Sequence, residues 1–389
     1  MQDFEFHEPT RTIFGRDALD QLSKVLLQLR VHSILAVSGV TYPEELGIQA
    51  KVTAVCDEQG IDLIWSDEVR PNPRLELVHQ LVDTAREHNV DLVIAVGGGS
   101  SIDTAKTIAL GVPYEHDVWD FFQRKAVPVT ALPIGVISTI PGSGSEQSDC
   151  AVIQEGRNKV FFENPLILPN FTIINPEFSR SVPTVYQSSA IADMTAHLLE
   201  VYATDEAPVD VTDRLIEASF TSVLIYGRKV IRDPQDVAVR SELHMLSAVT
   251  HNDGILGKGR IPDWVGHKIE HEISGLFGLI HGEGMSVVTP AWMRFVAARK
   301  PDKLVQFATR VFHIDAVSWT DAEIVEIAAA ELEAFYRELG LHTRLSEHGI
   351  SRTDLEDIAF RATQDGSILL GNYLQLNTAD VVELLEYAL

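Results

Sequence analysis

Short apolar runs rich in β-branched residues recur along the first half of the chain, separated by amphipathic stretches. The apolar runs predict buried strands at residues 33–37, 62–65, 91–96, 133–137 and 172–174. Two intervening stretches, residues 74–88 and 102–110, repeat apolar side chains at helical spacing. Strands that alternate with helices in this way predict a parallel sheet covered by helices on both faces.

The pattern changes near residues 178–183, where Pro176 and Pro183 interrupt the chain. Beyond this point the periodic stretches are helical, and we predict helices at residues 188–203, 212–228, 241–251, 322–339 and 380–388. The fold class is therefore α/β plus all-α. We predict an α/β domain over residues 1–180 and an all-helical domain over residues 181–389.

The net negative charge of the chain disfavours two classes of binding partner, nucleic acids and anionic membranes. Asp and Glu number 56 against 31 Lys and Arg, so the formal net charge is −25 at pH 7. Such an acidic surface repels phosphate backbones and anionic lipids, and we expect neither nucleic-acid nor membrane partners. The two cysteines, Cys56 and Cys150, form no paired motif, and the first residues lack the apolar core of a signal peptide. These features predict a cytoplasmic protein.

Two turns rich in small residues follow predicted strands. Residues 97–101 (Gly-Gly-Gly-Ser-Ser) lie between a strand and a helix, where free backbone N–H groups attract phosphate. Residues 139–146 form the second turn. The first does not match G-x-G-x-x-G and alone is as typical of a simple tight turn, and the second alone is more typical of an ordinary loop. Because both follow strands of a parallel sheet, at the edge where such sheets bind ligands, we expect a nucleotide site there.

Five metal-capable residues occupy two segments of the predicted helical domain. Asp193 and His197 are four residues apart, as are His267 and His271, and His281 follows ten residues later. On a helix, this spacing places both members of a pair on one face. A carboxylate with imidazoles suits Fe(II) or Zn(II), although a single such pair is more often a surface pair, and spacing alone leaves five candidates. The other histidines lack such neighbours, and we interpret them as surface or core residues: His7, His32, His79, His88, His116, His244, His251, His313, His342 and His348.

Together these motifs resemble the iron-containing (group III) alcohol dehydrogenase family. The resemblance runs nearly the whole length of the chain, and its branch is that of the NADPH-dependent butanol dehydrogenases and broad aldehyde reductases. Ser143 stands where the family's T-G-S-E turn has threonine. The segments that carry the resemblance are residues 4–15, similar to the family's N-terminal strand, 71–73, 97–100 with Asp103 and Lys106, 143–146, and 263–282 as the most specific.

The resemblance implies a Rossmann-like sheet domain and a helical domain, the dehydroquinate synthase-like architecture. It implies that primary alcohols and aldehydes are interconverted by hydride transfer with NADP(H) or NAD(H), with a metal as Lewis acid on the substrate oxygen. The family positions assign one divalent metal, Fe(II) or Zn(II), to Asp193, His197, His267 and His281. They place His271 beside the nicotinamide as the candidate catalytic residue. We also expect a homodimer.

The resemblance also bears on the choice of cofactor. NAD-preferring members commonly carry Asp at the position of Gly39, where it bonds the ribose hydroxyls and repels a 2′-phosphate. Gly39 permits NADP(H), which we favour over NAD(H), although residues 40–42 depart from the glycine-rich run of the NADP branch. The residues predicted to bind the cofactor are Ser38, Gly39, Thr41, Gly97, Gly98, Gly99, Ser100, Asp103, Thr139 and Ser143.

Two other functions fit the same motifs. A non-redox cyclase or lyase that uses NAD and a metal, similar to dehydroquinate synthase, needs a basic pocket for a phosphorylated substrate. Residues 264–285 supply only Lys268 among Lys and Arg, which disfavours this alternative, whereas Trp264 suits an apolar substrate pocket. A metal-binding protein without catalysis is the second alternative, and it would leave both glycine turns without a role.

Overall fold

Parallel strands form the sheet of the first compact unit. The computed structural model describes residues 1–39, 46–252 and 254–389. The described strands of the six-stranded sheet run in the order β1-β8-β5-β4-β2-β3, and every pair is parallel. They are β1 (Arg11–Phe14), β2 (Ser33–Gly39), β3 (Asp62–Val69), β4 (Leu92–Gly97), β5 (Ile134–Ser138) and β8 (Phe171–Ile174). The predicted strands and the parallel α/β fold class are confirmed.

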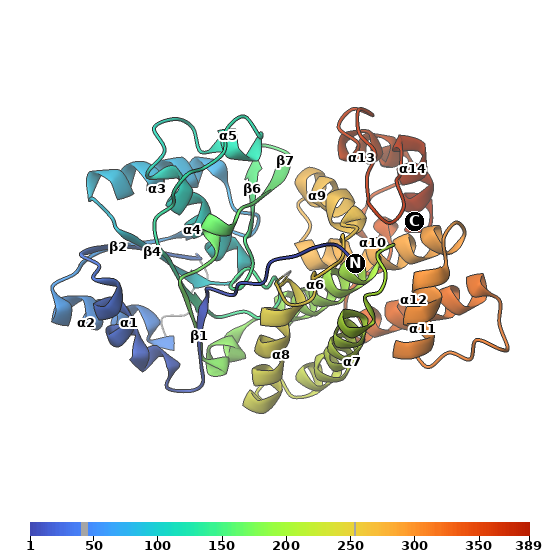
Figure 1. Cartoon of the computed structure of the whole chain (residues 1–389), viewed down its shortest axis with the longest axis horizontal. Helices are drawn as coiled ribbons and strands as arrows, with labels where there is room; N and C mark the ends of the chain where they lie inside the picture. The colour runs from blue at the N-terminus through green and yellow to red at the C-terminus, as the bar shows by residue number, and fades with distance from the viewer. Residues whose placement is uncertain (40–45, 253) are drawn as a thin grey trace. The chain divides into compact units, whose positions relative to one another are not determined.

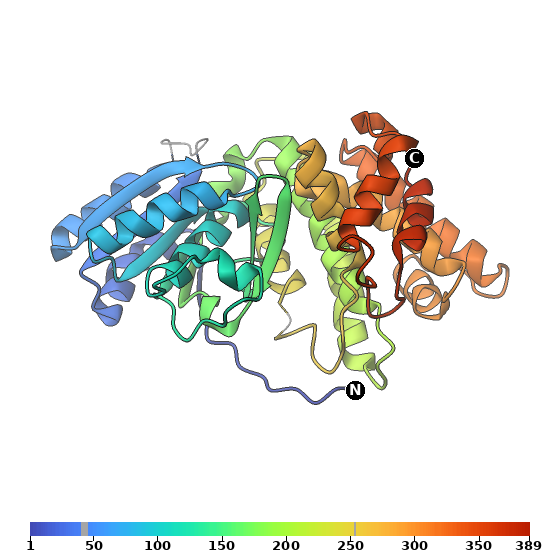
Figure 2. The same cartoon turned by 90° about the horizontal axis from the view of Figure 1, so that it is seen from above.

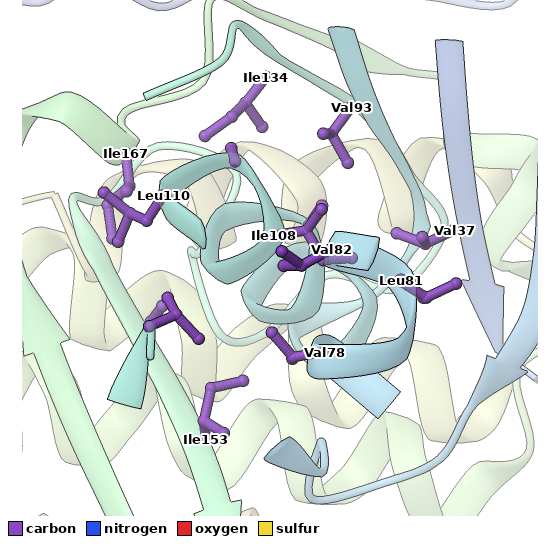
Figure 3. Packing of buried hydrophobic residues seen from close by; sticks show 14 of the residues in the cluster. Val37, Val78, Leu81, Val82, Val93, Ile108, Leu110, Ile134, Ile153 and Ile167 are labelled. Carbon is purple, nitrogen blue, oxygen red and sulfur yellow. The ribbon is translucent and has the colours of Figure 1, made fainter. Parts of the chain in front are cut away.

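Helices cover both faces of this sheet because successive strand residues point to opposite sides. On one face, Val37 and Val93 pack with α3 (Leu75–Glu87) and α4 (Gly99–Gly111), as Figure 3 shows. On the other face, the alternate residue Ile94 packs with α1 (Leu22–Leu29) and α2 (Ile48–Gln59). Figure 1 shows both layers, with the short α5 (Trp119–Phe122) beyond α3.

A two-stranded antiparallel hairpin that the apolar pattern did not predict joins this unit. It consists of β6 (Cys150–Glu155) and β7 (Asn158–Glu163), which are green in Figure 2. Ala151 and Ile153 of β6 are fully buried in the apolar cluster that also contains residues of α3 and α4. The hairpin thus extends the core of the sheet unit.

The second unit is helical. It contains α6 (Thr184–Tyr202), α7 (Asp210–Arg232), α9 (Val265–Phe277), α10 (His281–Ala297), α11 (Asp302–Val311), α12 (Asp321–Glu338), α13 (Leu355–Ala362) and α14 (Thr378–Glu386). Helix α6 is buried on nearly all sides and packs against α7, α9 and α10. No described helix has the length and apolarity needed to cross a bilayer.

Each of the two compact units is built from separate stretches of the sequence. One unit comprises Glu8–Val182 and Arg240–Ala248, and the other comprises Met1–His7, Pro183–Val239 and Val249–Leu389. Most of α8 (Val237–Thr250) therefore packs with the sheet unit. The division of the chain into domains at residues 180 and 181 stays a prediction.

Only the second half of the predicted N-terminal strand is a strand in the structure. Only β1 joins the sheet, and Pro9, which has no N–H to donate to a strand ladder, lies just before it. The amino group of Met1 donates to the carbonyl of Ala207, 2.7 Å away, in the helical unit. The strand implied for residues 4–15 is thus confined to Arg11–Phe14.

Candidate functional site

Three helices of the second unit carry the candidate metal ligands. Asp193 and His197 lie one turn apart on α6, His267 lies on α9, and His281 is the first residue of α10. Asp193 and His197 are almost completely buried. Gly282 allows the start of α10 to approach α6, since a Cβ there would lie 1.8 Å from the carbonyl oxygen of Ser189. The four side chains therefore meet inside one unit.

A single carboxylate oxygen faces three imidazoles. Asp193 Oδ1 lies 3.6 Å from Nε2 of His197, 3.4 Å from Nε2 of His267 and 3.3 Å from Nε2 of His281. Metal–ligand bonds of about 2.1 Å in a tetrahedral arrangement separate neighbouring ligand atoms by about 3.4 Å. The spacing of these atoms therefore fits one divalent metal.

Two of these atoms also lack an ordinary hydrogen-bond partner. Among the described residues, neither Asp193 Oδ1 nor His267 Nε2 has one, although both are buried. Buried polar atoms are rarely left so, and a bound cation would satisfy both. Burial acts to raise the pKa of Asp193, but the imidazoles of His197 and His281 hold it well below its ordinary value. The carboxylate is thus ionised and able to bind a metal.

The imidazoles differ in their ionisation because His267 contacts a second carboxylate, Glu200, whereas His197 has Asp193 alone. Burial holds the pKa of His197 well below its ordinary value, so the ring is neutral, as a metal ligand must be. Burial acts in the same direction on His267, but Glu200 and Asp193 together raise its pKa to about 10. A metal bound at His267 would replace that proton.

Two carboxylates orient the ligand rings from behind. Glu200 Oε2 contacts Nδ1 of His267, and Glu270 Oε2 contacts Nδ1 of His281. The other oxygen of Glu200 accepts from the backbone N–H of Gly266 at 2.6 Å. Such pairs keep the proton on Nδ1 and leave Nε2 free to bind a metal. The sequence analysis missed both glutamates, although Glu200 follows His197 by three residues and Glu270 follows His267 by three, a spacing that places each pair on one helix face.

His197 is held differently, by stacked rings. Its ring lies between those of His251 and His267, with centroids 4.3 Å and 4.6 Å away and interplanar angles of 19° and 12°. Trp264 lies edge-on to all three. The interpretation of His251 as a histidine without metal-capable neighbours is therefore wrong, because the fold brings a distant segment onto α6.

His271 lies at the margin of this cluster. It is one turn beyond His267 on α9, and its ring centroid is 5.5 Å from that of His281. It offers a ring nitrogen within 4.8 Å of ligand atoms of Glu270 and His281. The structure thus brings together all five residues that the spacing singled out.

The predicted nucleotide turns meet in the sheet unit. The chain runs from β2 outward to β3 and returns to β4 on the other side of β2, so the switch point lies between β2 and β4. Ser38 pairs with Val96, which places the ends of β2 and β4 side by side. Open α/β sheets bind ligands at this point. Of the predicted cofactor residues, Thr41 lies outside the described residues.

The two glycine-rich turns contact each other closely. Helix α4 starts at Gly99, and a Cβ there would lie 2.7 Å from Ser143 Oγ of the second turn. The N–H of Thr139 donates to the carbonyl of Gly97 at 3.1 Å. Gly98 and Ser100 flank Gly99 at the start of α4, where unbonded N–H groups suit phosphate.

Asp103 and Lys106 hold the second turn from the buried side of α4. Lys106 is fully buried, and its Nζ donates to Ser145 Oγ and to the carbonyls of Ser148 and Cys150 at 2.7–2.9 Å. Asp103 accepts from Ser145 Oγ at 2.7 Å. Its other oxygen accepts from the N–H of Val152 at 3.0 Å. Contact of Asp103 with the cofactor stays a prediction.

Helix α8 contributes to the same turn. Ser247 Oγ accepts from the N–H of Gly142 and donates to Glu146 Oε1, each at 2.8 Å. Both Ser247 and Glu146 are buried. The sequence analysis missed this residue because it lies far along the chain, within the stretch assigned to the helical domain.

Family models match the chain over both units. The model described as iron-containing alcohol dehydrogenase matches residues 9–176, and that of the C-terminal part of the Fe-containing alcohol dehydrogenase family matches residues 188–389. The chain belongs to the iron-containing alcohol dehydrogenase family.

Similar proteins cover the chain from end to end. A probable NADH-dependent butanol dehydrogenase 1 of Bacillus subtilis is 32% identical over 100% of both chains. An NADPH-dependent aldehyde reductase of Escherichia coli, YqhD, is 29% identical over 95% of each. The crystal structure of an NADH-dependent butanol dehydrogenase A from Thermotoga maritima has a TM-score of 0.94 at 28% identity, covering 100% of this chain and 99% of that one.

These comparisons confirm the predicted family, the two-part fold and the enzyme class. The family comprises oxidoreductases that use a nicotinamide cofactor and a metal, and interconversion of alcohols and aldehydes is confirmed for this chain at that level. The dehydrogenase interpretation is therefore favoured over the cyclase or lyase and over a metal protein without catalysis.

Proposed function

We propose that this alcohol dehydrogenase reduces short aldehydes and oxidises the corresponding primary alcohols at one divalent metal held by Asp193, His197, His267 and His281. The observation that carries the proposal is the position of Asp193 Oδ1, which faces three Nε2 atoms at 3.3–3.6 Å. When bound, Fe(II) or Zn(II) supplies a Lewis acid for the substrate oxygen. Both metals suit this donor set.

The residues around the site orient the imidazole ligands and provide an apolar surface next to them. Glu200 and Glu270 fix the tautomers of His267 and His281, so that both present Nε2 toward Asp193. The edge-on ring of Trp264 borders the imidazole stack and gives an aldehyde an apolar neighbour. By excluding water from that side, Trp264 would favour the substrate oxygen over water as the group on which a bound metal could act as Lewis acid.

His271 contacts the nicotinamide in this proposal, and Asp193 with its three imidazoles holds the metal alone. Two alanine variants test this division of roles. His267→Ala should lose most of its bound metal, whereas His271→Ala should keep the metal and bind NADPH more weakly. Metal content is measured after dialysis, and nucleotide binding by quenching of tryptophan fluorescence. Loss of metal from His271→Ala, with metal retained in His267→Ala, would refute the assignment.

We propose that pyrophosphate binds at Gly97, Gly98, Gly99 and Ser100, and that NADP(H) is favoured over NAD(H). Gly39, at the end of β2, offers no carboxylate to repel a 2′-phosphate. The named relatives include both NADH- and NADPH-dependent enzymes. Gly39→Asp tests the preference, since among the described residues a Cβ there meets Val69 O alone, at 3.4 Å, which is ordinary contact. The ratio of kcat/KM for NADPH over NADH should fall at least tenfold, and an unchanged ratio would contradict the proposal.

We further propose a cytoplasmic homodimer. Both cysteines are free and buried, which suits a reducing compartment. Helix α7 exposes Val211, Leu215 and Ile225 on one face, with 76%, 46% and 45% of their surfaces accessible, and this face is a candidate contact between copies. Light scattering of the purified chain should give twice the mass of one chain. The mass of a single chain would contradict the dimer.

A further inference from the structure

A second group of metal-capable side chains lies in the helical unit, apart from the four proposed ligands. Glu283 lies in the first turn of α10, His342 follows α12, and His348 ends the short helix η5 (Leu345–His348). Each offers one ligand atom, and these atoms lie within 4.8 Å of one another. We interpret His342 and His348 as surface or core histidines without metal-capable neighbours in the sequence, and the fold brings both close to Glu283.

The side chains already face one another. Nδ1 of His342 lies 3.1 Å from Oε1 of Glu283. The rings of His342 and His348 have centroids 4.9 Å apart and an interplanar angle of 83°. Among the described residues, Nε2 of His348 is buried and has no hydrogen-bond partner. A buried imidazole with an unsatisfied nitrogen, grouped with a carboxylate and a second imidazole, is a candidate for binding a cation.

The backbone around these residues is fixed before any ligand binds. Ser286 Oγ lies 2.8 Å from the carbonyl oxygen of Glu283 and 2.7 Å from that of His342, so it ties the two segments together. Glu347 caps η5, since its Oε2 accepts from the N–H groups of Thr343 and Arg344 at 3.0 Å. Glu347 is thereby occupied, and Glu283 is the carboxylate available to a cation. A fixed scaffold lowers the entropic cost of binding.

We propose that Glu283, His342 and His348 form a second divalent-cation site, distinct from the catalytic metal and selective for zinc. Two imidazoles and one carboxylate suit Zn(II) rather than Mg(II) or Ca(II), which prefer oxygen ligands alone. The half-exposed ring of His342 gives solvent access to complete the coordination. A cation here links the first turn of α10, which begins at His281, to η5, and so stabilises the helical unit.

Zinc titration of the full chain against a chelating indicator tests this site. Wild type should bind two equivalents, the second more weakly, and His348→Ala should bind one. His88→Ala is the matched control, because this exposed histidine lies far along the chain in the sheet unit. It should bind two equivalents like the wild type. Two equivalents in His348→Ala, or one in the wild type, would overturn the second site.

A second readout separates the two sites. With the Asp193 site already loaded in the proteins that keep it, excess zinc should raise the thermal unfolding midpoint of the wild type and of His267→Ala, but not that of Glu283→Gln or His348→Ala. The His348→Ala protein should keep its tight equivalent and its basal dehydrogenase activity. If the catalytic proposal is wrong, His267→Ala will keep its bound metal and its activity. If the second site is wrong, zinc will raise the thermal unfolding midpoint of His348→Ala as much as that of the wild type.

Discussion

Glu200→Gln is the change that tests most sharply how the candidate metal centre is built. Glu200 is 2% exposed and uses both carboxylate oxygens. Oε1 accepts from the N–H of Gly266 at 2.6 Å and from that of His267 at 3.3 Å, while Oε2 contacts His267 Nδ1. Glutamine has nearly the same shape but only one acceptor oxygen. It can therefore satisfy the backbone or the imidazole, but not both.

Either orientation of the new amide weakens the ligand. If the glutamine oxygen accepts from Gly266, its NH₂ group faces Nδ1 of His267 and favours the tautomer with the proton on Nε2, the atom that faces Asp193. If the oxygen faces Nδ1, the NH₂ group opposes the backbone N–H groups. Loss of such a supporting contact typically costs 10- to 100-fold in metal affinity, or about 1.4–2.7 kcal/mol. We expect Glu200→Gln to fall within this range.

The assay is metal affinity measured by competition with a chelator of known affinity, on wild type and variant. Glu217→Gln is the matched control, because Glu217 is also a buried glutamate of the helical unit but pairs with Tyr202 and Arg310. The control should keep wild-type affinity. Equal affinity in Glu200→Gln and wild type, with both proteins folded, would refute the proposed role of Glu200.

Three further predictions concern other parts of the molecule. His251→Ala should speed metal release by removing the ring stacked on His197, and His251→Phe should restore slow release; equal rates in all three would contradict this role. Gly99→Val should raise the KM for the nucleotide without changing metal content, since its side chain meets Ser143; an unchanged KM would count against the turn. Burial lowers the pKa of His244 from 6.5 to about 3. The contribution of this neutral imidazole to the free energy of unfolding is therefore fully present above pH 6.5 and is lost as the pH falls toward 3. At pH 5 the loss is about 2 kcal/mol, and His244→Leu should remove it in thermal unfolding; equal pH dependence in both proteins would contradict that cause.

The central strands of the sheet were predictable because they are buried on both faces. Strands such as β2 and β4 are therefore continuous apolar runs, which the sequence pattern reveals directly. The hairpin of β6 and β7 is different, since polar residues such as Gln154 and Lys159 interrupt its apolar positions. Its two-residue connection, Gly156-Arg157, is the signal that would have found it.

The candidate site was only partly predictable, for a reason that lies in tertiary packing. Helical spacing alone places Asp193 beside His197, because both lie on one face of α6. The approach of His281 depends on the packing of α10 against α6, which no local pattern encodes. His251 joins the cluster in the same way, whereas Glu200 lies on α6 itself, three residues after His197 and seven after Asp193.

The most direct test of the account is turnover of a short aldehyde by the purified chain in matched metal states. The protein is stripped with a chelator, reloaded anaerobically with one equivalent of Fe(II) or Zn(II), and assayed with butyraldehyde by the oxidation of NADPH and of NADH. We predict turnover after reloading, none in the stripped protein, and none in a folded His267→Ala variant. Equal turnover in stripped and reloaded protein, or none with any short aldehyde or alcohol, would contradict a metal-dependent alcohol dehydrogenase.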